Sequence, residues 1–123
     1  MKRIIAFFEI PASDFHRAVK FYESVFSTKL PIIECETEKM AFFHEKGTEQ
    51  YAGAISWAEN FSPSANGVLI SFNCKDIDCT LSAIVQNKGV VVTPKTKIEA
   101  EGRGYFAVFK DSEGNHVGLY EDK

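Results

Sequence analysis

Three features that would point directly to a class of function are scarce in the sequence: cysteine, basic charge and long apolar runs. Only three of its 123 residues are cysteines, at spacings unlike those of a zinc site or a disulfide framework, so we expect reduced thiols and a cytoplasmic protein. Lys and Arg number 14 against 17 Asp and Glu, and a net charge of −3 argues against nucleic acid as a partner. No run reaches the roughly 20 apolar residues of a membrane span, and Glu9 and Pro11 interrupt the apolar start before it forms a signal peptide.

Phenylalanine is the abundant residue. Eleven Phe and four Tyr can fill a core or line an apolar cavity, because each ring contributes a large apolar surface. A composition of 45% hydrophobic and 25% charged residues is ordinary for one globular unit of this length. We therefore expect residues 1–123 to form a single domain.

The first half of the chain predicts one strand, one helix and three further strands. The run from 3 to 10 is apolar and predicts a strand that Pro11 ends. Ser13 or Asp14 can cap a helix whose apolar residues recur at three- and four-residue spacing as far as Phe26. The three apolar runs that follow are residues 30–33, 40–43 and 51–57.

The same order returns after a polar linker at 60–66. A strand at 68–73 is followed by Asp76 as the cap of a second helix, with Gly89 expected in the left-handed conformation at its end. The remaining strands are predicted at 90–92, 105–109 and 117–120. The charged segment 94–103 reads either as a loop across the mouth of a pocket or as a plain surface loop.

This internal repeat, 1–60 and 67–123, predicts an α+β fold. It consists of two βαβββ modules whose sheets form a half-barrel. A half-barrel has a concave inner face, which is where a ligand would sit.

Two motif regions carry a family resemblance. The first is Phe8-Glu9-Ile10-Pro11 with Asp14 and the segment 18–22, and the second is the segment 104–115 with its Asp-Ser-Glu-Gly-Asn turn. Together they resemble the vicinal oxygen chelate superfamily, which includes glyoxalases, bleomycin-resistance proteins and extradiol dioxygenases. The resemblance is greatest to small bacterial glyoxalase-like proteins and covers essentially the whole chain. It implies paired βαβββ modules, a concave pocket and a homodimer, with a divalent metal held by His and Glu in the active members.

The positions where the superfamily carries its metal ligands hold other residues here. Counting from the two motifs places three of these positions at Phe7, Val68 and Gly118, and the fourth within 52–57. None of these side chains ligates Zn, Ni, Mn or Fe(II), so we expect no metal cofactor. One alternative stays open: Glu9, His44 and His116 would make a two-histidine, one-carboxylate set of the non-haem iron type.

A concave pocket without a metal could still bind or convert a small molecule. Glu9, beside aromatic residues, is the candidate general base, and His116 is the candidate acid or hydrogen-bond donor. The candidate ligand-binding residues are Phe7, Trp57, Phe72, Tyr105 and Tyr120. Each of these side chains could instead serve core packing.

Three functions remain open at this point. The first is metal-free binding of a small, partly aromatic or carbonyl-bearing molecule, as in bleomycin-resistance proteins. The second is an enzyme, a lyase, isomerase or dioxygenase similar to lactoylglutathione lyase, which uses Glu9 and His116 as base and acid or as unusual metal ligands. The third is a regulatory module that depends on a partner protein. A homodimer is expected in each case, because the modules leave sheet edges exposed.

Overall fold

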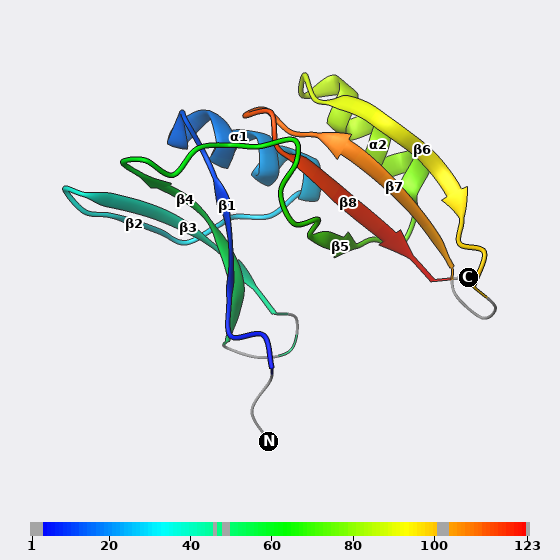
Figure 1. Ribbon diagram of the computed structural model, residues 1–123, viewed down its shortest axis with the longest axis horizontal. Helices are drawn as coiled ribbons and strands as arrows, with labels where there is room; N and C mark the ends of the chain where they lie inside the picture. Colours follow the sequence, from blue (N-terminus) through cyan, green and yellow to red (C-terminus); the bar gives the residue numbers. More distant parts are fainter. Residues whose placement is uncertain (1–3, 46, 48–49, 101–103, 123) are drawn as a thin grey trace.

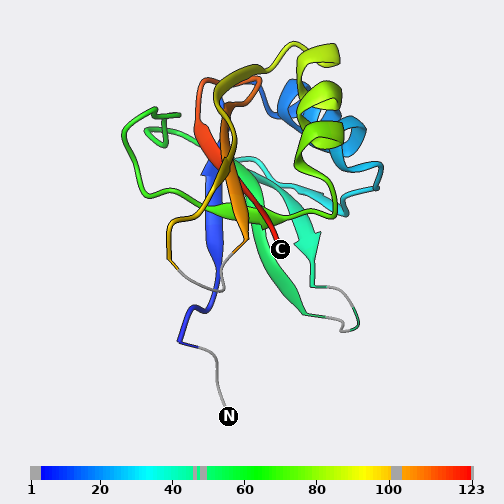
Figure 2. The same ribbon diagram turned by 90° about the vertical axis from the view of Figure 1, so that its right-hand side faces the viewer.

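The structure, a computed structural model, describes residues 4–45, 47, 50–100 and 104–122. Two four-stranded sheets lie side by side, and both helices pack behind them (Figures 1 and 2). The elements in chain order are β1 (Phe8–Pro11), α1 (Phe15–Phe26), β2 (Ile32–Glu34), β3 (Glu38–His44), β4 (Tyr51–Ala58), β5 (Ser71–Asn73), α2 (Ile77–Gln86), β6 (Val90–Lys97), β7 (Tyr105–Lys110) and β8 (His116–Glu121). Neither described helix is long and apolar enough to cross a membrane.

The two sheets have the same topology. Their strand orders are β1-β4-β3-β2 and β5-β8-β7-β6. In each sheet the strand before the helix pairs in parallel with the last strand of its module, and the other pairs are antiparallel. The predicted α+β class and the two βαβββ modules are therefore confirmed.

Helix α1 begins and ends where short-range chemistry dictates. The Asp14 side chain accepts a hydrogen bond from the backbone N–H of Arg17, which satisfies one free amide of the first turn. The helix ends at Ser27, whose φ of 50° is left-handed. Its apolar face is buried between the two modules through Phe15, Ala18, Val19, Phe21, Tyr22 and Val25. Burying a large apolar side chain contributes about 1.5–3 kcal/mol, so this face fixes α1 in place.

The end of α2 differs from the prediction. Lys88, with φ of 73°, takes the left-handed conformation that the sequence pattern assigned to Gly89. Gly89 is needed for space instead, because a Cβ there would lie 2.6 Å from Cγ2 of Ile84 and 3.0 Å from the carbonyl oxygen of Lys110. The helix start is as predicted, with Asp76 accepting from the backbone N–H of Cys79.

Several strand limits also differ. β1 starts at Phe8 and β5 at Ser71, later than expected, because each pairs only where the last strand of its module runs alongside. β6 continues to Lys97, and Thr96 and Lys97 pair with β7. The first part of the segment predicted as a loop, 94–103, is therefore strand, while 101–103 lies outside the described residues.

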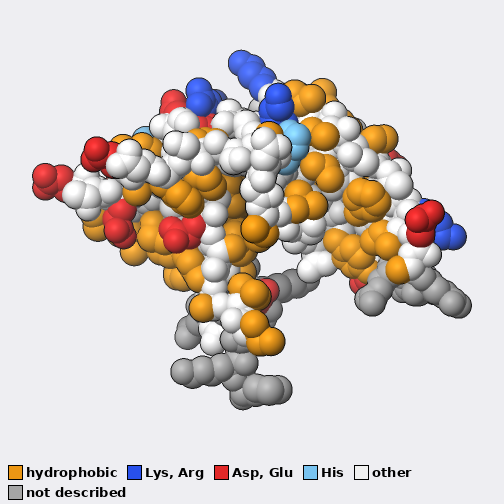
Figure 3. Space-filling view, in the orientation of Figure 1, with side chains coloured by type: hydrophobic (Ala, Val, Ile, Leu, Met, Phe, Trp, Pro, Cys, Tyr) orange, Lys and Arg blue, Asp and Glu red, His pale blue; other side chains and the backbone are white. Residues whose placement is uncertain are grey.

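Strand alternation divides each sheet into two faces. The helix-packed face carries the core, which includes Ile10, Phe43 and Ile55 in the first sheet and Phe109 and Leu119 in the second. We call the opposite side, the one turned to the viewer in Figures 1 and 3, the open face. Figure 3 shows apolar side chains across the middle of this face and acidic side chains mainly over β2–β4.

Candidate ligand-binding groove

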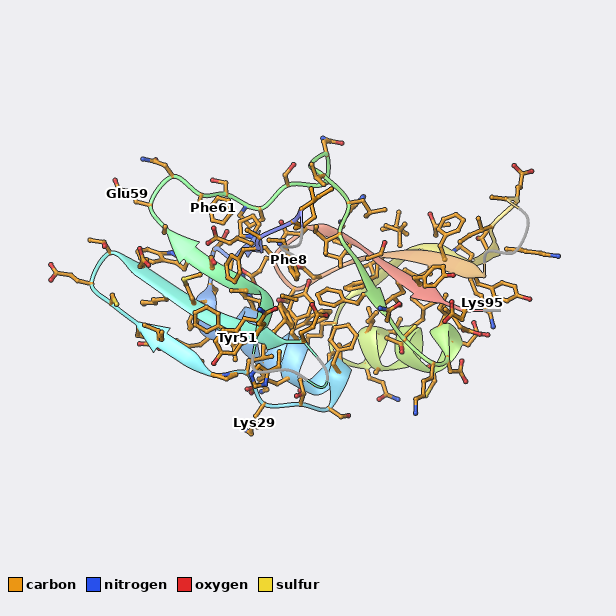
Figure 4. The ribbon with its side chains drawn as sticks, turned by 90° about the horizontal axis from the view of Figure 1, so that it is seen from below. Phe8, Lys29, Tyr51, Glu59, Phe61 and Lys95 are labelled. Carbon is orange, nitrogen blue, oxygen red and sulfur yellow. The ribbon has the colours of Figure 1, made fainter. Side chains whose placement is uncertain are left out.

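A groove of about 400 Å³ lies between β1, the start of β8 and the linker that joins the modules. Its walls are Phe8–Pro11 of β1, then Phe61, Ser62, Ser64, Gly67, Val68 and Ile70, and Asn115–Val117. In Figure 4 the linker, with Phe61 on it, runs along one side of the molecule, while Phe8 lies near the middle, where the sheets meet. A larger hollow of about 740 Å³ over the outside of α1 is lined mostly by exposed polar side chains and is a poorer candidate.

Glu9 enters the groove from β1. Its Oε1 accepts a hydrogen bond of 2.7 Å from Oγ of Ser56, a residue that is only 3% exposed. The two side chains share the open face because β1 and β4 pair in parallel, with Glu9 opposite Ala54 and Pro11 opposite Ser56. The sequence analysis missed this partner, although a lone serine in the apolar strand Tyr51–Ala58 was the available signal.

His116 enters the same groove from the first position of β8. Its backbone N–H donates to the carbonyl oxygen of Ser64 at 3.4 Å, which holds the linker against β8. The two residues predicted as base and acid thus come from different modules and line one groove.

Asn115, which precedes β8, forms hydrogen bonds to β1 and to the linker and so connects the three walls of the groove. Its Nδ2 donates to the carbonyl oxygen of Pro11 at 2.8 Å, and its Oδ1 accepts from the backbone N–H of Ser64 at 3.0 Å. The side chain is 4% exposed, so both bonds are shielded from water. The sequence analysis treated Asn115 only as a turn residue, because its partners lie far along the chain.

The turn between β7 and β8 binds the start of α1 and so positions β1 against β8. Asp111, 3% exposed, accepts from the hydroxyl of Tyr22 at 2.6 Å. Burial, with a contribution from nearby Asp111, raises the pKa of Tyr22 well above 10.0. Glu113 accepts from the backbone N–H groups of Ser13 and Asp14 at 3.0 and 2.8 Å, and from Nε of Arg17 at 2.7 Å.

We expect this junction to weaken in acid. Burial alone would raise the pKa of Glu113, but the hydrogen bonds from Arg17 and Asp14 outweigh it and lower the pKa below 4.5. A lowered folded-state pKa stabilises the protein above pH 4.5, and that contribution is lost as the pH falls through the folded value. Glu113→Gln should therefore lower the free energy of unfolding at pH 7 and flatten its dependence on pH below 4.5. Urea unfolding between pH 7 and pH 3 measures the free energy of unfolding and its dependence on pH. The same dependence on pH in Glu113→Gln and in the original protein would contradict this role.

Two predicted ligand-binding residues lie on the open face beyond the groove walls. The ring of Phe7 packs against Phe42, with centroids 6.2 Å apart. The hydroxyl of Tyr120 donates to Asp122 at 3.0 Å. Tyr120 is four residues beyond His116, which is about 13 Å along a strand, so it lies at the other end of β8.

The other three belong to the helix-packed side. Phe72 packs against Phe26 and Phe43, at 5.0 Å between centroids in each case. Trp57 and Tyr105 pack at the edge of the core and are covered by Lys39 and Lys95, whose Nζ atoms lie 5.1 and 4.7 Å from the ring centroids. The structure therefore places Phe72, Trp57 and Tyr105 on the opposite side of the sheets from Glu9.

The two-module topology and the groove at the junction lead to a comparison with known families. The model of the Glyoxalase/Bleomycin resistance protein/Dioxygenase superfamily matches residues 4–119. The chain belongs to this superfamily. No curated protein matches the sequence.

Solved structures of superfamily members share the fold at low identity. A glyoxalase/bleomycin-resistance/dioxygenase domain from Frankia sp. EAN1pec is 12% identical, with a TM-score of 0.74 and all of both chains covered. A glyoxalase/bleomycin resistance protein from Albidiferax ferrireducens T118 is 16% identical, with a TM-score of 0.69, covering 98% of this chain and 100% of that one. TnmS3, an antibiotic-binding protein from Streptomyces sp. CB03234, is 19% identical, with a TM-score of 0.69 and coverages of 99% and 98%.

The residues present do not fit the metal that the superfamily implies. Matching the helix caps Asp14 and Asp76 places Leu69, not Val68, opposite Phe7, and either residue is non-ligating. At Gly118 even a Cβ would collide with the Ser71 side chain, so the neighbouring strand occupies the space of a ligand.

The alternative ligand set is not assembled. His44 stacks on Tyr51 with centroids 4.9 Å apart, and it lines a different pocket from the groove that contains Glu9 and His116. Within the described part of the chain, no three His, Cys, Asp or Glu side chains are arranged so that they could hold a metal ion. We derive no step of the function through a metal.

Proposed function

We propose that this protein binds a small, partly aromatic or carbonyl-bearing molecule in the groove and does so without a divalent metal. The observation that carries the proposal is the groove itself, which combines apolar walls from both modules with one anchored carboxylate and one imidazole. Its volume of about 400 Å³ falls within the range of small-molecule sites, which are mainly apolar with a few placed polar groups. The superfamily fold that it shares with an antibiotic-binding protein supports the same function.

The walls of the groove predict a binding defect for Val68→Asp. Val68 is 89% exposed in the ligand-free chain and would be covered by a bound apolar molecule. A carboxylate there removes apolar contact and must be desolvated, so the affinity for a neutral aromatic ketone such as Prodan should fall by about fivefold or more. Fluorescence titration measures the dissociation constant.

Val85→Asp is the matched control, because Val85 is also exposed, at 55%, but lies on α2 away from the groove. Equal losses in both variants, or none in either, would contradict the assignment of the groove. Extensive dialysis against a chelator should leave Prodan binding unchanged. Binding that disappears with the chelator and returns with Zn, Ni, Mn or Fe(II) would contradict the metal-free proposal.

A second candidate rests on Glu9 and His116 lining one groove from opposite modules. In this alternative, a lyase, isomerase or dioxygenase of the superfamily, Glu9 removes a proton next to a substrate carbonyl and His116 donates to its oxygen. Turnover of an α-hydroxycarbonyl substrate that is lost in Glu9→Gln would favour it over binding alone.

We also propose that two chains associate as a homodimer in the cytoplasm. β1 and β5 are edge strands; Ile4, shortly before β1, is 99% exposed, and Leu69, shortly before β5, is 50% exposed. Exposed edges with apolar neighbours favour pairing with a second copy. The thiols of Cys35 and Cys79 are exposed and unpaired, as suits a reducing compartment. Sedimentation at micromolar concentration tests the dimer.

A further inference from the structure

We propose that the groove selects ligands that carry a cationic amine and discriminates against anionic ligands, glutathione conjugates among them. This inference rests on the proposed binding function and specifies the charge of its ligand. Nothing in the family match or the shared fold sets that charge, so it has to come from the side chains of this chain.

The lining of the groove contains an acidic residue but no basic one among the described lysines and arginines. Among the described residues that line it, Glu9 is the only acidic residue. His116 is the one other ionisable group in the walls. A ligand carboxylate or phosphate would therefore enter the groove without a cationic partner.

The carboxylate of Glu9 is placed to receive a donor. Ser56 binds Oε1 at 2.7 Å and limits the rotation of the side chain. Oε2 has no hydrogen-bond partner among the described residues. A carboxylate that lines a cavity, with one oxygen anchored and the other without a protein partner, is a natural acceptor for an ammonium group, because charge-assisted hydrogen bonds are stronger than neutral ones.

The nearest cations do not reverse this balance. Arg17 is already paired with Glu113 at 2.7 Å, and Lys39 lies over Trp57 on the other side of the sheet. Lys110 is opposite His116 in the β7–β8 ladder, but it is exposed and does not line the groove. On the open face the acidic side chains gather over β2–β4, beside β1 (Figure 3). Lys and Arg side chains gather instead along the upper edge of this face (Figure 3), so the charged neighbours of β1 over β2–β4 are mainly acidic.

The test is a set of three ligands with the same ring and a small substituent of different charge: 1-naphthylmethylamine, 1-naphthalenemethanol and 1-naphthoic acid. Each displaces Prodan from the 123-residue protein at pH 7.5 and low salt. The amine should bind about threefold to fivefold more tightly than the alcohol, the size expected of one exposed ion pair, and the acid should bind most weakly. Raising the salt concentration should reduce the advantage of the amine, because ions screen exposed charges.

Glu9→Gln should bring the amine-to-alcohol ratio close to one, and it keeps the number of heavy atoms in the side chain. Glu59→Gln is the matched control, since Glu59 is exposed near Phe61 but does not line the groove. It should keep the wild-type ratio. Circular dichroism and thermal unfolding establish that both variants fold.

The outcomes separate the two proposals. Equal affinity for all three ligands, or tightest binding of the acid, would overturn the inference about charge and leave the binding function standing. A preference for the amine that survives in Glu9→Gln would overturn the role of Glu9. If neither Prodan nor any of the three binds, the proposed function fails and the inference fails with it.

Discussion

Asp111→Ala is expected to lower the free energy of unfolding by about 3–5 kcal/mol, because it leaves several buried donors without a partner and each costs about 1–3 kcal/mol. The Asp111 carboxylate accepts from the Tyr22 hydroxyl at 2.6 Å, from the backbone N–H groups of Glu113 and Asn115 at 2.9 Å each, and from Nδ2 of Asn115 at 3.1 Å. Removing it leaves the hydroxyl of Tyr22, a fully buried residue, without a partner. It also releases the turn that holds α1 against the second module.

Urea unfolding followed by circular dichroism measures this loss. Tyr22→Phe removes only the hydroxyl and should cost about 1–2 kcal/mol, so the double variant should lose less than the sum of the two single variants. Asp122→Ala, an exposed aspartate near the end of β8, is the control and should change stability by less than about 0.5 kcal/mol. A loss below about 1 kcal/mol in Asp111→Ala would show that the junction is held by apolar contacts alone.

Gly53→Ala should be the second large effect, at about 2–3 kcal/mol, because it forces extra volume into a packed sheet. A Cβ at this position would lie 2.5 Å from both the carbonyl oxygen and Cδ2 of Phe8. The ring could rotate away, but the carbonyl oxygen belongs to β1, which pairs with β4 at this register. The substitution should therefore displace β1 from β4.

Because β1 forms one wall of the groove, Gly53→Ala should also weaken Prodan binding. Thermal unfolding and fluorescence titration of the same sample report the two effects together. Gly67→Ala is the matched control for stability alone, since no atom lies within 4 Å of a Cβ built there, although Gly67 itself lines the groove. An equal loss of stability in both variants would mean that the close approach of Phe8 to Gly53 is not the cause.

The elements that local chemistry determines could be predicted from the sequence. Asp14 and Asp76 cap their helices through partners three residues away, and both were identified as candidate caps. The turn that carries Asp111 and Asn115 was predicted for the same reason, but its bonds to Tyr22 and Pro11 span 89 and 104 residues. A single sequence carries no signal that links groups so far apart.

The other differences from prediction concern which face of a strand a side chain occupies. β4 (Tyr51–Ala58) is apolar on both sides, so alternation could not show that Trp57 faces the helices while Ser56 faces Glu9. Phe72 and Tyr105 were predicted to contact a ligand from their aromatic character alone, which suits a core equally well. The linker was predicted to be a polar spacer, although Phe61 in it forms part of the groove wall, as does Val68, which was predicted to begin the next strand.

Phe8 belongs both to the lining of the groove and to the aromatic core. It lines the groove, yet its ring also packs 5.9 Å from Phe43 and 6.0 Å from Phe72 in the aromatic core between the modules. In the proposed binding function, a ligand in the groove would contact this ring, and the ring would transmit that contact to the aromatic packing behind it. Ligand affinity and folding stability would therefore be coupled through one side chain, and substitutions that refit the groove around Phe8 should also change the free energy of unfolding.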